Sequence, residues 1–174
     1  MTDKIDLSVI IPVYNEAATC AEIIKRVQAI SIVLEIIVVD DASTDGTIDI
    51  LETIDNIKVI RHEQNSGKGA AVRTGLAHVM GNYVITQDAD LEYDPNDYLK
   101  LAEPVVNGIT EVVYGSRWLN KPIEWNIHYL INQMITLFAN VFNGVFLTDI
   151  STCYKLIPTT LLQGLDLQAN GFGI

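Results

Sequence analysis

Short runs of aliphatic and β-branched residues alternate along the chain with segments whose apolar residues recur every three to four positions. The runs predict buried strands, and the periodic segments predict helices with one buried face. The expected strands are 7–11, 36–39, 58–61, 83–87 and 112–115, and the expected helices are 20–30, 47–54, 68–79 and 94–106. This alternation predicts an α/β fold with a doubly wound, mostly parallel sheet, in one domain over residues 1–174.

Polar and charged residues follow directly after each expected strand. Ligands of such sheets bind outside the carboxyl ends of the strands, and these ends meet along one edge. A surface scatter of charge would not gather there, so the pattern indicates an active site. The candidate residues on this rim are Pro12, Tyr14, Glu16, Asp40, Asp41, Gly67, Lys68, Asp88, Asp90, Glu92 and Arg117.

Asp88 and Asp90 lie two positions apart just beyond a strand, with Glu92 close behind. If the extended conformation continues, both aspartates point the same way. Carboxylate oxygens suit Mg²⁺ or Mn²⁺, which commonly lie between a few carboxylates and the phosphates of a substrate. The alternative is that the two aspartates only stabilise a loop.

The remaining rim residues suit a nucleotide. Asp40 and Asp41 can accept hydrogen bonds from a base or a ribose, and the ring of Tyr14 offers a stacking face. Gly67 allows close approach of the backbone, and Lys68 beside a helix N-terminus suits a phosphate. A plain turn with a surface lysine is the alternative.

Arg117 follows the strand expected at 112–115. From there it can bind a second anion through its planar fork. A surface arginine on a loop is the alternative, and only the position of Arg117 on the rim favours binding.

Composition excludes several classes of function. The formal net charge of −11 argues against a nucleic-acid binder, which needs a basic face. The two cysteines are far apart and suit reduced thiols, and the acidic N-terminus lacks the pattern of a signal peptide. We therefore expect a cytoplasmic protein. EF-hand, P-loop, dinucleotide-binding and receiver-domain motifs each lack a required residue at a required position.

Residues 125–148 contain no Lys, Arg, Asp or Glu. Their apolar residues follow helical spacing and form one broad face, which predicts an amphipathic helix. Several Asn residues, with Gln133, make a full membrane span the least favoured arrangement. Contact with a membrane surface, burial against the sheet and use in a homo-oligomer remain open alternatives.

Six motifs together resemble family-two glycosyltransferases of the GT-A fold, and within them the branch of dolichyl-phosphate mannose synthases and bacterial polyprenyl-phosphate sugar transferases. The motifs, in the family's order, are PVYNE, VVDDASTDGT, NSGKGAA, QDADLEYDP, GSR and DISTCYK. The resemblance implies that Pro12, Tyr14, Glu16 and Asp41 line a nucleotide pocket. It also implies that Asp88, Asp90 and Glu92 serve the metal and the donor diphosphate. Arg117 and the segment with Ser151, Thr152 and Lys155 would approach the phosphate of a lipid acceptor.

The chain departs from this branch at residues 152–155 and in the helix after Arg117, which is often basic in the branch but has no Lys, Arg, Asp or Glu over residues 125–148 here. The branch often has S-G-[FY]-R where this chain has residues 152–155, so Lys155 keeps the charge but loses the guanidinium fork. Family members also continue beyond Ile174, so we expect a C-terminal continuation.

Together with the rim residues, this resemblance implies an inverting, metal-dependent transfer of a sugar from a UDP- or GDP-sugar to a polyprenyl phosphate, at the cytoplasmic face of a membrane. The catalytic residues expected are Asp88, Asp90 and Arg117. Transfer to a saccharide hydroxyl, and a catalytically silent nucleotide-sugar binding module, are the alternatives.

Overall fold

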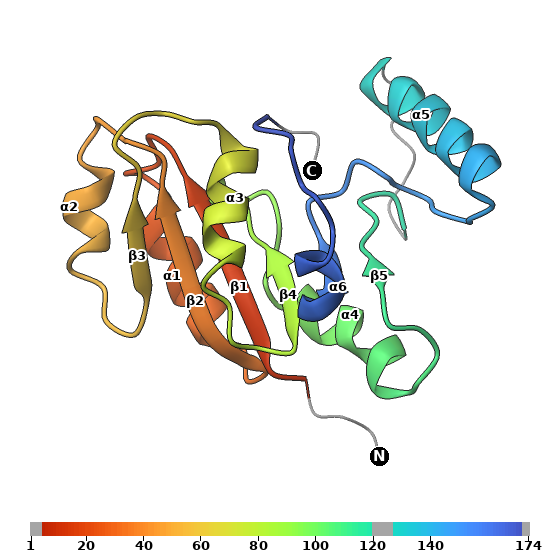
Figure 1. The fold of residues 1–174 in the computed structure, drawn as a ribbon, viewed down its shortest axis with the longest axis horizontal. Helices are drawn as coiled ribbons and strands as arrows, with labels where there is room; N and C mark the ends of the chain where they lie inside the picture. Colours follow the sequence, from red (N-terminus) through yellow and green to blue (C-terminus); the bar gives the residue numbers. More distant parts are fainter. Residues whose placement is uncertain (1–4, 120–126, 172–174) are drawn as a thin grey trace.

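A six-stranded sheet forms the centre of the protein, with strand order β3-β2-β1-β4-β6-β5. The structure is a computed structural model that describes residues 5–119 and 127–171. The elements are β1 (Leu7–Val13), α1 (Cys20–Gln28), β2 (Val33–Asp40), α2 (Thr47–Leu51), β3 (Lys58–Arg61), α3 (Lys68–Leu76), β4 (Tyr83–Thr86), α4 (Asp97–Val106), β5 (Val113–Tyr114), α5 (Ile127–Asn143), β6 (Lys155–Pro158) and α6 (Thr159–Gln163). Figure 1 shows their arrangement.

The four strands β1 to β4 are parallel, as predicted. β1 pairs with β2 along its whole length, from Leu7 opposite Val33 to Val13 opposite Asp40, and it pairs with β4 on its other side. β6 runs antiparallel to both β4 and β5. The chain moves outward from β1 in one direction through β2 and β3, and in the other direction to β4. This reversal of strand order is where doubly wound sheets bind ligands.

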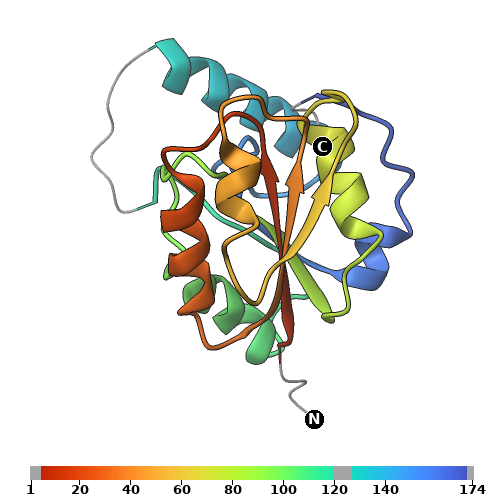
Figure 2. The same ribbon diagram turned by 90° about the vertical axis from the view of Figure 1, so that its left-hand side faces the viewer.

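Helices cover both faces of the sheet, with α1, α2 and α4 on one face and α3 and α6 on the other (Figure 2). Alternate residues of β1 explain the two layers, because successive side chains of a strand point to opposite faces. Val9 and Ile11 pack in the larger core with Ile24 of α1, whereas Ile10 packs with Leu76 of α3. All but Leu76 are 0% exposed.

The close packing of α3 on β1 depends on Gly75. A Cβ atom at this position would lie 2.6 Å from Cγ2 of Ile10, closer than real Cβ contacts. The small residue therefore lets the helix lie directly on the strand.

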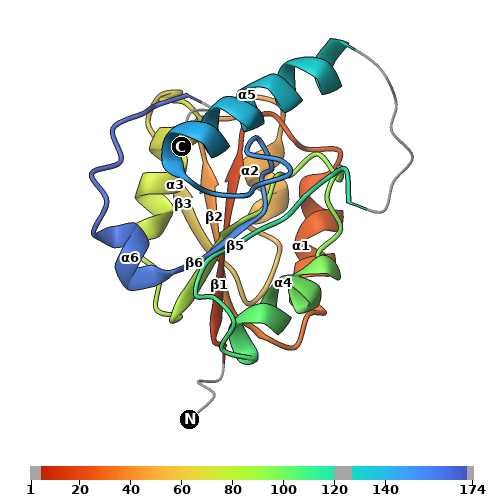
Figure 3. The same ribbon diagram turned by 90° about the vertical axis from the view of Figure 1, so that its right-hand side faces the viewer.

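α5 lies beyond the carboxyl ends of the strands, apart from both helical layers (Figures 1 and 3). The expected amphipathic helix is present, although Trp125 and Asn126 lie outside the described residues. Its orientation is unusual, because its polar residues Asn132 and Thr136 are 7% and 2% exposed. The large apolar residues face outward and are exposed: Leu130, Ile131, Met134, Ile135, Leu137, Phe138, Val141 and Phe142. The alternative in which the apolar face of this helix is buried against the sheet is therefore wrong. Among the described residues, no helix is long and apolar enough to cross a bilayer.

One local prediction needs correction, and two elements were not predicted. α4 begins at Asp97 rather than just after Asp94, although Asp94 does accept a hydrogen bond from the Asn96 N–H, at 3.0 Å. The chain makes a separate turn there before the helix. β6 and α6 were not predicted, because a strand of only four residues that ends in Pro158 leaves too short a pattern.

Candidate active site

The predicted rim exists, and the topology explains it. β1, β2 and β4 are parallel, so the residues that follow Val13, Asp40 and Thr86 emerge at the same edge. β6 runs in the opposite direction, so its first residue, Lys155, lies at that edge too, paired with Tyr114 at the end of β5. The antiparallel strand thus brings residues 151–155 to the rim.

Asp41 is buried and fully engaged by the protein. Its Oδ1 accepts hydrogen bonds from His62 Nδ1 (2.6 Å) and the Ser66 N–H (2.9 Å), and its Oδ2 accepts one from the Gly67 N–H (2.8 Å). Burial alone would raise the pKa of Asp41, but these hydrogen bonds outweigh it and the pKa lies below the ordinary value. Asp41 therefore shapes the 62–67 loop, and His62 helps to hold it.

Asp40 is also turned inward, and its side chain is 0% exposed. It accepts a hydrogen bond from the Ser43 N–H (3.2 Å) and lies 3.3 Å from Arg61 Nε. Neither Asp40 nor Asp41 presents an open carboxylate at the rim in this structure, and their binding of a nucleotide stays a prediction. Asp40 ends β2 and Asp41 follows it, and their carboxylates hold the loops that follow β2 and β3.

The loop after β1 offers more open groups. Tyr14 is 48% exposed, which leaves its ring available for stacking. Glu16 is half-buried and accepts a hydrogen bond from Thr19 Oγ1 (2.8 Å), and Pro12 is half-buried within β1. Of the residues expected in the nucleotide pocket, Tyr14 is therefore the most accessible in this part of the rim.

Gly67 sits at the N-terminus of α3 with φ +91°, in a region that favours glycine. A Cβ atom there would lie 2.3 Å from the carbonyl oxygen of Asn170. The same carbonyl accepts a hydrogen bond from the Gly69 N–H (2.8 Å). The helix N-terminus, expected to face a phosphate, is in this structure occupied by the chain after α6.

Lys68 donates a hydrogen bond from its ammonium group to Asp88 Oδ1. Desolvation would lower the pKa of Lys68, but Cys153, Asp88 and Asp90 act together in the opposite direction and the pKa is raised. Two residues predicted from separate motifs are therefore brought together, with a cation already beside the Asp88 carboxylate.

The three expected metal ligands do not form a preassembled cluster. In the part of the chain that the structure describes, no group of three or more His, Cys, Asp or Glu side chains is arranged to hold an ion. β4 ends at Thr86, so the extended conformation assumed for Asp88 and Asp90 does not continue. Asp90 Oδ1 instead accepts a hydrogen bond from the Glu92 N–H (3.0 Å), and Leu91 between them has φ +65°.

Asp88 and Asp90 still fit a divalent cation. Asp88 is half-buried and Asp90 is exposed, and their oxygens suit Mg²⁺ or Mn²⁺, which bind one or two carboxylates together with substrate phosphates. The ammonium of Lys68 marks the position at Asp88 where positive charge is stabilised.

Gln87, which sequence reasoning missed, fixes the chain just before Asp88. Its Oε1 accepts hydrogen bonds from the hydroxyls of Tyr98 (2.5 Å) and Tyr154 (2.7 Å), and its Nε2 donates to the Asp88 carbonyl (2.9 Å). Gln87 is 0% exposed, and its place directly after an apolar run is the signal that the sequence offers for this role.

Arg117 is bound to Asp149, a residue of the DISTCYK motif that was not assigned a role. Arg117 Nε donates to Asp149 Oδ2 (2.8 Å), Nη2 donates to Oδ1 (2.9 Å), and the Arg117 N–H also donates to Oδ2 (3.2 Å). Asn132 of α5 donates from Nδ2 to Oδ1 (3.0 Å). The hydrogen bond to Asp149 raises the pKa of Arg117 further, so it stays charged.

The residues before β6 divide into exposed and buried positions. Ser151 is exposed, whereas Thr152 is 1% exposed. Lys155 donates from Nζ to the Thr152 carbonyl (2.5 Å) and lies 5.5 Å from the ring centroid of Tyr114. Of this segment, Ser151 and Lys155 are better placed for a ligand than Thr152.

Neighbouring charges link Lys155 to the donor side of the rim. Burial lowers the pKa of Lys155, and the positive charge of Lys68 also lowers it, whereas Asp149 and Asp88 act in the opposite direction. The pKa of the buried Cys153 thiol is raised to about 12, mainly by desolvation, so this thiol stays protonated.

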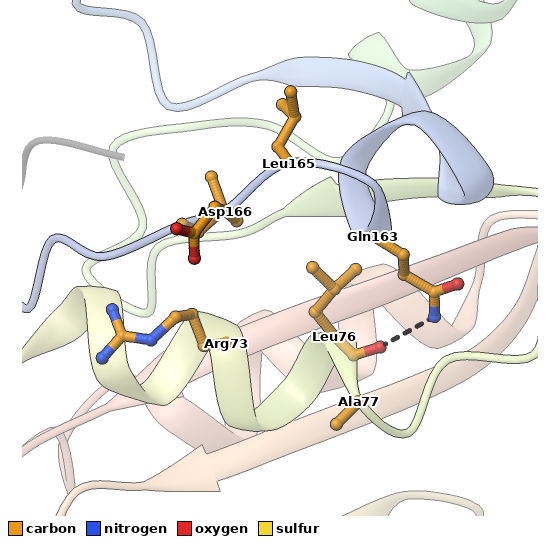
Figure 4. Close-up of a pocket in the computed structure, with 7 residues that line it drawn as sticks. Arg73, Leu76, Ala77, Gln163, Leu165 and Asp166 are labelled. Atoms are coloured by element: carbon orange, nitrogen blue, oxygen red, sulfur yellow. Dashed lines mark hydrogen bonds between the residues drawn. The ribbon is translucent and has the colours of Figure 1, made fainter.

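Surface hollows lie beside the rim and along α3. One, of about 600 Å³, is lined by Arg61, His62, Glu63, Gln64 and Ser66, beside the loop that Asp41 holds. The other, of about 300 Å³, lies between α3 and the chain after α6 (Figure 4) and is lined by Arg73, Leu76, Ala77, Gln163, Leu165, Asp166 and Leu167. The second hollow contains none of the predicted site residues.

Two relatives whose names state a glycosyltransferase activity are similar to this chain in sequence. The chain is 31% identical to the UDP-N-acetylglucosamine–dolichyl-phosphate N-acetylglucosaminyltransferase of Methanococcus voltae, over 97% of this chain and 75% of that protein. It is 35% identical to the dolichol-phosphate mannosyltransferase of Pyrococcus furiosus, over 97% of this chain but only 50% of that protein. The chain thus spans half to three quarters of the length of these two relatives.

The fold is that of GT-A glycosyltransferases. Glucosyl-3-phosphoglycerate synthase from Mycobacterium tuberculosis, solved in complex with Mn²⁺, UDP and phosphoglyceric acid, matches with a TM-score of 0.75 and 25% identity, over 98% of this chain and 61% of that one. The family model "Glycosyl transferase family 2" matches residues 8–162. The resemblance stated from the motifs is therefore confirmed, and the chain belongs to glycosyl transferase family 2.

Proposed function

We propose that this protein transfers a sugar from a UDP- or GDP-sugar to the phosphate of a polyprenyl lipid, with inversion at the anomeric carbon and with Mg²⁺ or Mn²⁺ as cofactor. The observation that carries the proposal is that the Lys68–Asp88 pair and the segment that ends at Lys155 lie on the same rim of the sheet. Cys153 Sγ, two residues before Lys155, donates a hydrogen bond to the Thr86 carbonyl (3.3 Å), which ends the strand that leads into Asp88. A site for an anionic acceptor therefore borders the site for the donor diphosphate. The names of the two relatives, both of which act on a lipid phosphate, support this acceptor class.

Each part of the rim has a task in this reaction. Asp88 and Asp90 would hold the divalent cation, which neutralises charge on the leaving diphosphate. The exposed ring of Tyr14 stacks on the base. Lys68 binds the diphosphate after its ammonium group has left Asp88. Arg117 and Lys155 orient the acceptor phosphate.

The chemistry is a direct displacement. An oxygen of the acceptor phosphate attacks the anomeric carbon, a new carbon–oxygen bond forms, and the bond to the nucleoside diphosphate breaks with its electron pair passing to the leaving oxygen. A phosphate monoester has a second pKa of about 6 and is already ionised near neutral pH. The reaction therefore needs no general base, in contrast to transfer to a sugar hydroxyl.

The first experiment partitions the product. The chain is incubated with Mn²⁺, undecaprenyl or dolichyl phosphate in detergent, and labelled UDP-N-acetylglucosamine or GDP-mannose, and the mixture is then extracted with butanol. Label in the butanol phase is expected from at least one donor, and its loss is expected in Asp90→Asn. Asp55→Asn, an exposed aspartate before β3 and therefore at the opposite rim, is the matched control. Label that stays in the water phase, on a saccharide, would contradict the lipid acceptor, and binding without any transfer would favour a silent binding module.

The metal site has a test of its own. Because Lys68 places a cation beside Asp88, Lys68→Met is expected to tighten the binding of Mn²⁺ alone, by about tenfold if the lost competition is about 1.4 kcal/mol. The same variant is expected to weaken the binding of UDP or GDP in the presence of Mn²⁺, because a phosphate contact is lost. Isothermal titration measures both. Unchanged Mn²⁺ binding would remove Asp88 from the proposed cation site.

We also propose that the outer face of α5 lies on the surface of a membrane. Its residues are apolar and outward-facing, residues 125–148 carry no charge, and α5 lies beyond the rim that holds Arg117. A helix that lies in the interface with its apolar face in the acyl region would keep Arg117 close to the depth of lipid headgroups. A dimer through the same face is the competing arrangement.

Vesicles of phosphatidylcholine distinguish the two arrangements. Wild-type protein is expected to sediment with them, and the amount bound is expected to change little with salt, because the helix has no charge. Phe138→Ser combined with Phe142→Ser is expected to abolish binding. Met80→Ser is the control, since Met80 is 77% exposed in the turn before β4 at the opposite rim. A concentration-dependent dimer that these substitutions disrupt, without vesicle binding, would favour the competing arrangement.

A further inference from the structure

The guanidinium group of Arg117 is hydrogen-bonded along one edge by Asp149 and covered on one face by Trp118. Two of its five N–H groups, on Nε and Nη2, point to the two oxygens of Asp149 at 2.8 and 2.9 Å. Its Cζ lies 5.5 Å from the ring centroid of Trp118, so an aromatic ring covers one face. The N–H groups that Asp149 does not use belong to Nη1 and to the far side of Nη2. The side chain thus presents a fixed edge of donors, which suits a phosphate.

Asp149 cannot itself serve as a ligand or a base. Each of its oxygens already accepts two hydrogen bonds: Oδ2 from Nε and the N–H of Arg117, and Oδ1 from Nη2 of Arg117 and Nδ2 of Asn132. Its side chain is 0% exposed. Burial would raise the pKa of Asp149, but the hydrogen bonds from Arg117 and Asn132 outweigh it, so the carboxyl stays ionised. A saturated, buried carboxylate orients its partner.

The third member of the cluster comes from α5. Asn132 is 7% exposed and points inward from the helix whose outer face is apolar. Further polar contacts hold the same segment: Gln133 Nε2 donates to the Thr148 carbonyl (3.4 Å), and the Ile150 N–H donates to Thr136 Oγ1 (3.3 Å). The inward face of α5 is therefore built around residues 148–150. This explains why the polar residues of the helix point inward.

We propose that Asp149 is the positioning residue for Arg117, and that Asn132 of α5 holds Asp149 in place. One helix then has two tasks, because its outer face meets the lipid while its inner face sets the orientation of the arginine that binds the acceptor phosphate. The inference rests on the proposed function for the identity of the acceptor. The positioning of Arg117 by Asp149 can be measured without it.

The kinetic test uses a soluble acceptor, geranyl phosphate, so that membrane binding does not enter. Asp149→Asn keeps the shape of the side chain but removes its charge, and it is expected to raise KM for geranyl phosphate by about tenfold or more, since a bidentate charged pair is lost. Asn132→Leu is expected to raise it by a smaller factor. The affinity for UDP or GDP with Mn²⁺ is expected to stay within about twofold in both, because neither residue belongs to the donor side. A parallel loss of nucleotide binding would instead indicate general damage to the fold and would overturn the proposal.

A double-mutant cycle tests whether Asp149 acts through Arg117. In an Arg117→Ala background, Asp149→Asn is expected to have no further effect on transfer, because the side chain that it orients is gone. Effects of the two substitutions that multiply would contradict the proposal.

The last measurement is independent of catalysis. The Nε–H resonance of Arg117 in ¹⁵N-labelled protein is expected to be sharp and slow to exchange with solvent, and to broaden or exchange quickly in Asp149→Asn. If this holds while no prenyl phosphate accepts sugar, the proposed function fails and the positioning role stands. If the resonance is unaffected by Asp149→Asn, the positioning role fails whatever the substrate.

Discussion

α1 and α5 are both amphipathic, yet they turn opposite faces to the body of the protein. In α1 the buried residues are Cys20, Ile23, Ile24 and Val27, and the charged residues Glu22 and Arg26 form a pair on the surface. In α5 the buried residues are the polar Asn132 and Thr136, and the exposed ones are aliphatic and aromatic. One helix is held by removal of apolar area from water, and the other by specific hydrogen bonds.

The difference teaches that an apolar stripe does not by itself identify the inner face of a helix. α1 completes the main core, so its role is the stability of the sheet. α5 leaves a large apolar face without cover in the described structure, and exposed patches of this kind mark interaction sites. Its stability and its function therefore depend on different faces.

The strongest test of the contrast places one charge on each apolar face. Ile24→Asp puts a carboxylate into the core beside β1 and is expected to cost more than about 4 kcal/mol, enough to prevent folding. Phe142→Asp changes a residue that is 81% exposed and is expected to change stability by less than about 0.5 kcal/mol. Urea unfolding followed by circular dichroism measures both. A comparable loss in Phe142→Asp would mean that the outer face of α5 is covered by the protein itself.

A second pair of substitutions compares the two faces of α5 itself. Asn132→Leu removes a donor to the buried Asp149 carboxylate and is expected to destabilise the docking of α5 by about 1–3 kcal/mol. Ile131→Asn, one position away and 49% exposed, is expected to be nearly neutral. Hydrogen exchange of the amides in α5 measures the local effect. Faster exchange in Ile131→Asn than in Asn132→Leu would reverse the assignment of the faces.

Mild acid is expected to lower the stability of α5 more than that of α1, although this effect is smaller than those of the substitutions. The pKa of Asp149 in the folded protein lies below the ordinary aspartate value of about 3.9, so its contribution to stability is fully present above that value. It is lost as the pH falls through the folded pKa. Below about pH 4, protection of α5 against exchange should therefore fall while that of α1, held by apolar contacts, persists. Simultaneous loss in both helices would contradict the contrast.

The centre of the sheet could be predicted from the sequence because β1 and the second half of β2 are buried on both faces. The unbroken apolar run that ends at Val39 is an example, and so is the position of Asp40 directly after it. The direction of α5 could not be predicted, because helical periodicity fixes the width of an apolar face but not what the face meets. The pairing of Arg117 with Asp149 spans 32 positions. No local pattern records such a contact.

The metal ligands illustrate a subtler limit. The spacing of Asp88 and Asp90 suggested a shared direction, and that inference assumed a strand that continues. The structure ends β4 at Thr86 and turns the chain through Leu91. Gln87 could not be assigned either, since its role depends on two tyrosines from α4 and from the segment before β6.

The antiparallel β6 has a consequence for synthesis on the ribosome. β4 lies between β1 and β6, so a nascent chain that has released only residues before 155 leaves one side of β4 without its partner. An unpaired edge of this kind is a template for aggregation. The parallel half of the sheet can assemble early, but its outer edge stays open until the last strand has emerged. A ribosome that pauses within the codons for α5 would prolong this interval, and a chaperone that binds the nascent chain would be most useful then.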